Sequence, residues 1–72
     1  MNNESIKYII MRIVERALDA NNEYKANKDD AFQQGRNTAY YEVLDILRSE
    51  LEVREEDLKD YGLNIDLEKD LL

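Results

Sequence analysis

Carboxylates are the side chains best placed for chemistry in this sequence, because the chain of 72 residues contains no histidine and no cysteine. Acids recur at helical spacing, which would bring their oxygens to one helix face. Oxygen ligands arranged in this way can hold Mg²⁺ or Mn²⁺. The candidate metal ligands form two i, i+3 pairs, Glu42 with Asp45 and Glu52 with Glu55. These pairs raise one hypothesis, a metal-dependent hydrolase.

The same two pairs loosely resemble the E-x-x-E and E-x-x-D helices of the all-α nucleotide pyrophosphohydrolases. The resemblance implies a divalent metal ion and nucleotide hydrolysis. Here the order of the pairs is reversed, and the chain is shorter than that fold needs to form a substrate pocket. Bases also alternate with the acids, as Arg48 does between Asp45 and Glu52, and weak ion pairs on solvated helix faces explain that pattern equally well. We therefore favour a protein without enzymatic activity, metal or cofactor.

The sequence offers few residues that could carry out nucleophilic catalysis. A serine nucleophile would need a lysine or a carboxylate as its base, and the only serines are Ser5 and Ser49. Ser5 is typical of a helix cap, and Ser49 of a helix surface or a local capping box with Glu52. The two glycines of the chain are isolated, so they cannot form a phosphate-binding loop.

The acidic charge is concentrated in the last third of the chain. Residues 1–49 hold eight acids against seven bases, whereas residues 50–72 hold nine acids against three bases. Scattered bases and a net charge of −7 argue against direct nucleic-acid binding, which needs a basic stripe. An acidic protein can instead imitate nucleic acid, so an inhibitor of a basic DNA-binding protein is an alternative function. The predicted partner surface comprises Glu52, Glu55, Glu56, Asp57 and Asp60.

The elements that must position these residues are helices. The chain has no proline and only two glycines, so little interrupts its helical periodicity. We predict one all-α domain over residues 1–72, with helices over residues 5–25 and 30–51 and an acidic segment over residues 52–72. The connection between the helices is short and polar, which makes them an antiparallel hairpin. Its candidate N-caps are Asn27, Asp29 and Asp30.

Each predicted helix carries an apolar arc that is wider than one neighbouring helix can cover. On the first helix, steps of three and four residues connect Ile6 to Tyr24, and a second apolar stripe flanks them. A core of this size rarely provides more than about 3–5 kcal/mol, and a chain without cysteine gains no disulfide. We therefore predict a homodimer, in which two hairpins form a four-helix bundle. The predicted core and dimer interface contains Ile6, Ile9, Ile10, Ile13, Val14, Ala17, Tyr40, Val43, Leu44 and Leu47.

A ridge of small residues predicts where the two helices approach most closely. Ala31, Gly35 and Ala39 are spaced i, i+4, i+8 on the second helix. Ala20 lies toward the same end of the hairpin on the first helix, and the distance between packed helices falls as the side chains at their contact become smaller. Alternatively, Gly35 marks a kink or a late start of the second helix.

The acidic segment also contains apolar residues that a solvated tail would not need. We predict a helix that starts at the acids near Glu55 and ends at Tyr61, with Gly62 in the left-handed conformation. The chain beyond it is predicted to be irregular or to form a final short helix capped by Asn64 or Asp66. Five apolar residues are expected to dock on the bundle with the carboxylates outward: Leu63, Ile65, Leu67, Leu71 and Leu72.

The sequence thus favours a protein–protein interaction module that pairs with itself and with a further protein, as a small regulator or adaptor. The stretch from Ala39 to Leu47 is similar in style to short proteins of Gram-positive bacteria and their phages, which indicates a bacterial or phage origin. No stretch resembles a signal peptide or approaches the roughly 20 apolar residues of a membrane span. We expect a cytoplasmic protein that does not bind membranes.

Overall fold

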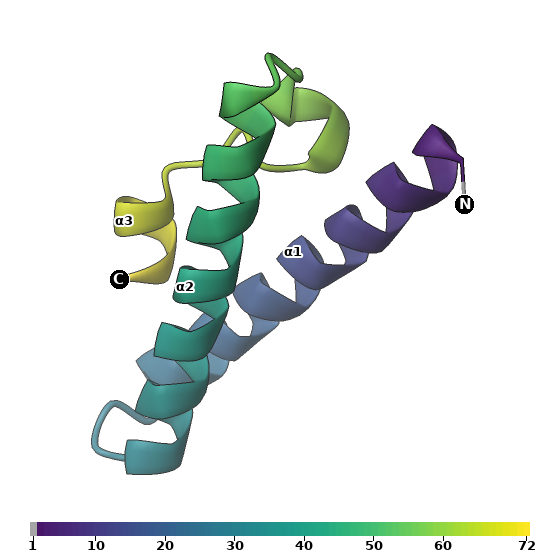
Figure 1. Ribbon diagram of the computed structural model, residues 1–72. Coiled ribbons are helices and arrows are strands. Elements are labelled where there is room, and N and C mark those ends of the chain that lie inside the picture. Colours follow the sequence, from purple (N-terminus) through teal and green to yellow (C-terminus); the bar gives the residue numbers. More distant parts are fainter. Residues whose placement is uncertain (1) are drawn as a thin grey trace.

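The computed structural model describes residues 2–72, and within that range every regular element is helical (Figure 1). The elements in chain order are α1 (Asn3–Ala26), α2 (Ala31–Val53), the 3₁₀ turn η1 (Leu58–Tyr61) and α3 (Leu67–Leu71). The predicted all-α hairpin with a short C-terminal helix is confirmed. None of the helices in residues 2–72 combines the length and the apolar character needed to cross a membrane.

Side-chain caps explain where the two long helices begin. The Asn2 side chain accepts a hydrogen bond of 2.8 Å from the backbone N–H of Ser5, and Asn2 is the N-cap of α1. Asp30, one of the three predicted caps, accepts from the backbone N–H groups of Phe32 and Gln33. Each cap satisfies amide groups that have no partner inside the helix. The helices therefore start within two residues of the predicted positions.

The hairpin is open at one end, and the chain after α2 fills the opening. Figure 1 shows that α1 and α2 lie close together at their connecting loop and diverge toward the N-terminus of α1. The 3₁₀ turn η1 and the helix α3 each contact both long helices. The hairpin by itself therefore forms only part of the core, and the C-terminal segment completes it.

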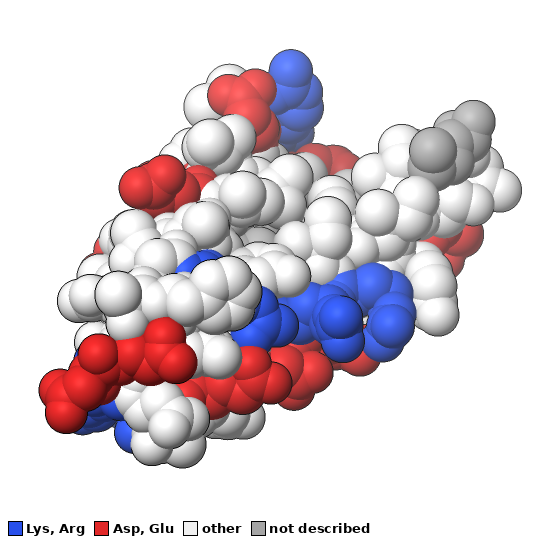
Figure 2. Space-filling model, turned by 90° about the horizontal axis from the view of Figure 1, so that it is seen from below, with Lys and Arg blue, Asp and Glu red and all other residues white. Residues whose placement is uncertain are grey.

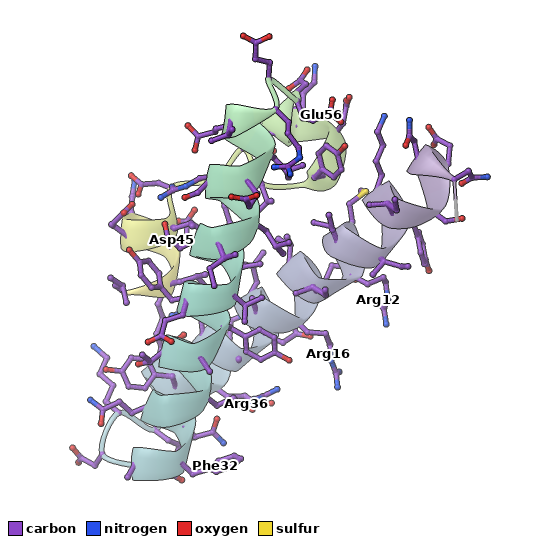
Figure 3. The ribbon with its side chains drawn as sticks, in the orientation of Figure 1. Arg12, Arg16, Phe32, Arg36, Asp45 and Glu56 are labelled. Carbon is purple, nitrogen blue, oxygen red and sulfur yellow. The ribbon has the colours of Figure 1, made fainter. Side chains whose placement is uncertain are left out.

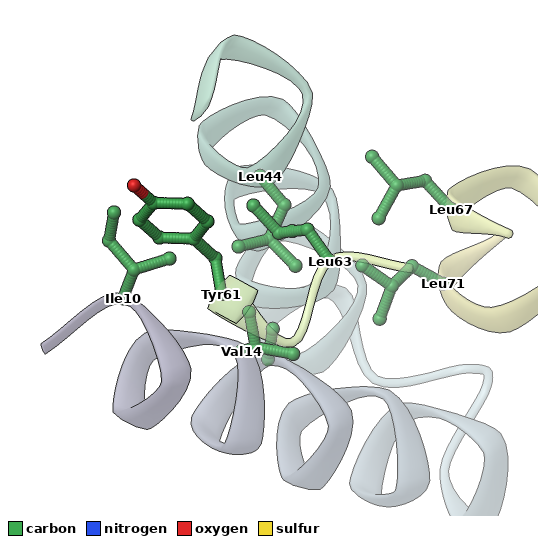
Figure 4. Close-up of a cluster of buried hydrophobic side chains, with 8 residues drawn as sticks. Ile10, Val14, Leu44, Tyr61, Leu63, Leu67 and Leu71 are labelled. Atoms are coloured by element: carbon green, nitrogen blue, oxygen red, sulfur yellow. The ribbon is translucent and has the colours of Figure 1, made fainter. Parts of the chain in front are cut away.

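One cluster of buried side chains forms this core (Figure 4). Its members are Ile10, Val14, Ala17, Leu44, Tyr61, Leu63, Leu67 and Leu71. Leu63, Leu67 and Leu71 are fully buried and Ile65 is packed against the cluster, which confirms the predicted docking of these four residues. The same prediction is wrong for Leu72, which follows the last helical residue and is 64% exposed.

The chain reverses direction at Glu55 and does not begin a helix there, so that part of the prediction is wrong. Glu55 has a φ of 58°, a left-handed conformation that no residue inside a right-handed helix adopts. The 3₁₀ turn begins later, after the N-cap Asp57, and ends as predicted at Tyr61. Gly62 follows with a φ of 75°. Asp66, one of two predicted caps, is the N-cap of α3.

The close helix crossing is not formed by the predicted small residues. Ala20 is fully buried, but Ala31, Gly35 and Ala39 are exposed, and a Cβ atom at Gly35 would meet nothing within 4 Å. The physical reason is the rotation of α2 about its axis, which turns Asn37 and not Gly35 inward. Because α2 begins at Ala31, the alternative of a late start at Gly35 is also wrong.

Candidate functional site

The acids proposed as metal ligands lie at separate places on α2 and the turn after it. Glu42, Asp45, Glu52 and Glu55 are not gathered: no group of three or more acidic side chains in residues 2–72 is placed to share a metal ion. Two of them instead pair with Arg48, whose guanidinium lies 3.1 Å from Asp45 and 3.8 Å from Glu52. Glu42, Asp45 and Glu52 lie on α2, whereas Glu55 lies in the turn after it. Glu68 of α3 also lies 3.7 Å from the Arg48 guanidinium, so these carboxylates are arranged around an arginine.

The acids predicted as a partner surface are exposed, but most have partners within the chain. The five residues are Glu52, Glu55, Glu56, Asp57 and Asp60. Glu56 accepts a hydrogen bond from the Tyr61 hydroxyl, and Asp57 accepts one from the backbone N–H that follows it by two residues. The Asp60 carboxylate lies 3.6 Å from Lys7 Nζ. These contacts hold the turn around η1 in place, so the acidic charge here serves the fold.

The hydrogen bond between Tyr61 and Glu56 leads to a prediction for alkaline pH. This hydrogen bond, burial and the nearby carboxylates raise the pKa of Tyr61 above its ordinary value of 10.0. The folded chain therefore holds the phenol proton more tightly than the unfolded chain does. The resulting stabilisation is present below the ordinary pKa and is lost as pH rises through the raised pKa of the folded chain.

A tyrosine absorbance titration measures this effect. The pKa of Tyr61, obtained as the difference between the titration curves of the wild type and Tyr61→Phe, should lie above the ordinary value of 10.0. Glu56→Gln should bring the pKa of Tyr61 down. A pKa of Tyr61 that stays the same in Glu56→Gln would contradict the assignment.

Two buried asparagines connect all three α-helices, and sequence reasoning missed them. The Asn21 Nδ2 donates a hydrogen bond of 3.0 Å to the Asn37 Oδ1, and the Asn37 Nδ2 donates one of 2.6 Å to the backbone oxygen of Leu71. Both asparagines are almost fully buried. The available signal was their position, since Asn21 follows Ala17 by four residues on the buried stripe of α1 and Asn37 precedes Leu44 by seven on α2.

The predicted interface residues divide between the core and the surface. Ile10, Val14, Ala17 and Leu44 are buried in the chain itself, and Ile13, Tyr40 and Leu47 are half-buried at its edge. Ile6, Ile9 and Val43 are exposed. The apolar arcs of both helices thus extend beyond the core, onto a side that the C-terminal segment leaves uncovered.

A groove between α1 and α2 occupies this uncovered side. We call it the open groove; its volume is about 270 Å³, and its walls are formed by Tyr8, Ile9, Arg12, Ile13, Arg16 and Tyr40. A smaller hollow of about 150 Å³ continues it along α2, lined by Arg36, Ala39, Tyr40 and Val43. Figure 3 shows Arg12, Arg16 and Arg36 on the opposite side of α2 from α3. The open groove is thus apolar along its floor and bordered by arginines.

Beside the open groove, α2 exposes a row of large apolar side chains. We call this row the α2 ridge; it consists of Phe32, Val43 and Ile46. Ile46 is 62% exposed although it is a large aliphatic side chain in the middle of a helix. The open groove and the α2 ridge together form one continuous surface, the open face.

The arginines give the open face a positive border in an acidic protein. Figure 2 shows basic side chains between a stretch of uncharged surface and a row of acidic side chains. Arg12 pairs with Glu15 at 2.9 Å, and Arg36 pairs with Glu23 and lies 5.9 Å from the centre of the Tyr40 ring. Arg16 forms no salt bridge within residues 2–72. The border therefore has positive charge available for an acidic group from another chain.

Comparison of the chain with protein-family models, with curated proteins and with solved structures finds no match in any of the three. The open face is consequently interpreted from its own chemistry.

Proposed function

We propose that this protein is a non-enzymatic interaction module that pairs with a second copy through its open face. The observation that carries the proposal is the exposure of large apolar side chains on both long helices, Ile9 on α1 and Val43 and Ile46 on α2. Contiguous apolar surface of this kind marks interaction sites in soluble proteins. The acidic residues around η1 do not support the proposal, because most of their carboxylates have partners within the chain.

Pairing through the open face would cover the apolar side chains that the single chain leaves exposed on α1 and α2. The C-terminal segment already covers one side of the hairpin, so a second copy needs to cover only the other side. Two hairpins joined by a two-fold axis give a four-helix bundle in which both copies contribute the same surface. Tyr8, exposed at the margin of the groove, suits the edge of such an interface, where one end of the ring is covered and the hydroxyl stays in water.

Two valine-to-glutamate variants on α2 test the proposal. Val43→Glu places a charge in the open face and should weaken dimerisation by about a hundredfold or more, since burying an unpaired carboxylate is unfavourable. The matched control is Val53→Glu, because Val53 is 77% exposed near the end of α2 and lines neither hollow, whereas Val43 is 44% exposed. Sedimentation at micromolar concentration measures the dimer, and circular dichroism confirms that both variants stay helical.

A wild-type chain that sediments as a fully folded monomer at these concentrations would refute the proposal. Equal dimerisation of Val43→Glu and the wild type would also refute it, because the interface would then lie elsewhere.

A further inference from the structure

We infer that the open groove receives Ile46 of the second copy, with Arg12 and Arg16 pairing with the carboxylates of Glu42 and Glu50 on that copy. This inference rests on the proposed dimer and names its contacts. It assigns a role to the arginine border, which an apolar dimer interface alone would not require.

The first argument is the chemical pattern of α2. Glu42, Ile46 and Glu50 are spaced i, i+4, i+8 and are all exposed, so they follow one another along the outer face of the helix. The pattern is an apolar side chain with a carboxylate one turn above it and another one turn below it. Glu50 pairs with the exposed Arg54 at 2.8 Å, a surface contact weak enough to be exchanged for another.

The second argument is the matching pattern of the groove. Arg12 and Arg16 lie one turn apart on α1, beside the apolar wall formed by Ile9 and Ile13. The groove therefore presents two positive groups next to a hollow that accommodates one large aliphatic side chain. Glu42 and Glu50 of the second copy are about 12 Å apart along their helix, and Arg12 and Arg16 are about 6 Å apart along theirs. The arginine side chains are long enough to bridge this difference in spacing.

The third argument is closure of the dimer. Tyr40 and Val43 of α2 line the hollows on the open face, and Ile46 stands on the ridge beside them. A surface that carries a knob beside a hole can pair with a second copy about a two-fold axis so that both contacts form at once. Each copy then inserts its own Ile46 and receives that of its partner, so the contact ends at two copies.

A charge exchange between two variants tests these contacts. The first variant is Arg12→Glu with Arg16→Glu, and the second is Glu42→Arg with Glu50→Arg. All four positions are exposed in the single chain, so circular dichroism should show that both variants fold. Each variant alone places like charges across both symmetric contacts and should dimerise at least about tenfold more weakly than the wild type.

Mixing the two variants should restore dimerisation to within a few-fold of the wild type, as a heterodimer that native mass spectrometry identifies by its mass. In the mixed dimer both contacts again join opposite charges. The matched control for the arginine variant is Lys25→Glu with Lys28→Glu, which makes the same change in net charge as that variant at exposed positions outside the groove. This control should dimerise like the wild type or slightly more weakly.

The outcomes separate this inference from the proposed function. A wild-type dimer that Val43→Glu disrupts, together with charge variants that recover nothing on mixing, would overturn the inference and leave the proposed function intact. A wild-type chain that remains monomeric would overturn both, and the open groove would then be a site for a different protein.

Discussion

Replacing Leu63 with alanine is expected to lower the free energy of unfolding by about 2–5 kcal/mol. Leu63 is fully buried and lies in the core with Val14, Leu44 and Leu71 (Figure 4). Since a core of this size rarely provides more than about 3–5 kcal/mol, this loss would remove a large part of the stability of the chain. Urea or thermal unfolding followed by circular dichroism, at one fixed protein concentration, measures the loss.

Leu72→Ala is the matched control for this experiment. The same side chain is removed from the same segment, but Leu72 is exposed, so the free energy of unfolding should change by no more than about 0.5 kcal/mol. If Leu63→Ala proved as stable as Leu72→Ala, the C-terminal segment would not be part of the core.

Replacing Asn37 with alanine is the second change expected to have a large effect. The Asn21 side chain would lose its acceptor and the backbone oxygen of Leu71 would lose its donor, both in a buried environment. Each unsatisfied group costs roughly 1–3 kcal/mol. The change should also release the end of α3, because Asn37 is the side chain that donates to its last helical residue.

Three experiments distinguish this loss from a general weakening of the helix. Hydrogen exchange should accelerate first in α3, since that helix loses its hydrogen bond to α2. Asn22→Ala, an exposed position on α1 beside the buried Asn21, should leave stability unchanged or slightly raised because alanine favours helix. The double variant Asn21→Ala with Asn37→Ala should be less destabilised than the sum of its parts. Strict additivity would show that the two amides do not act together.

The open face and the core use the same two helices for different purposes. On α2, Leu44 is buried in the chain, and Val43 beside it is left at the surface. A mutation at Leu44 should therefore change the stability of the single chain, and one at Val43 should change association. The proposed dimer depends on this separation.

The sequence by itself determined the two long helices and the docking of Leu63, Leu67 and Leu71, and it included Asp30 and Asp66 among the candidate caps. The absence of proline, the three- and four-residue steps and a capping residue such as Asp30 are local properties, and they act in the same way whatever the rest of the chain does. The left-handed Gly62 belongs to this group, because only a residue without a Cβ adopts that conformation at little cost.

Only the tertiary structure decided which part of each wide apolar arc is covered. Periodicity shows how wide an arc is, but the rotation of each helix about its axis depends on every segment that packs against it. In the folded chain the hairpin is open at the end where η1 lies, Gly35 faces outward and Val43 lies at the surface. The same packing placed Asn21 and Asn37 opposite each other, a contact between residues on different helices that no local spacing encodes.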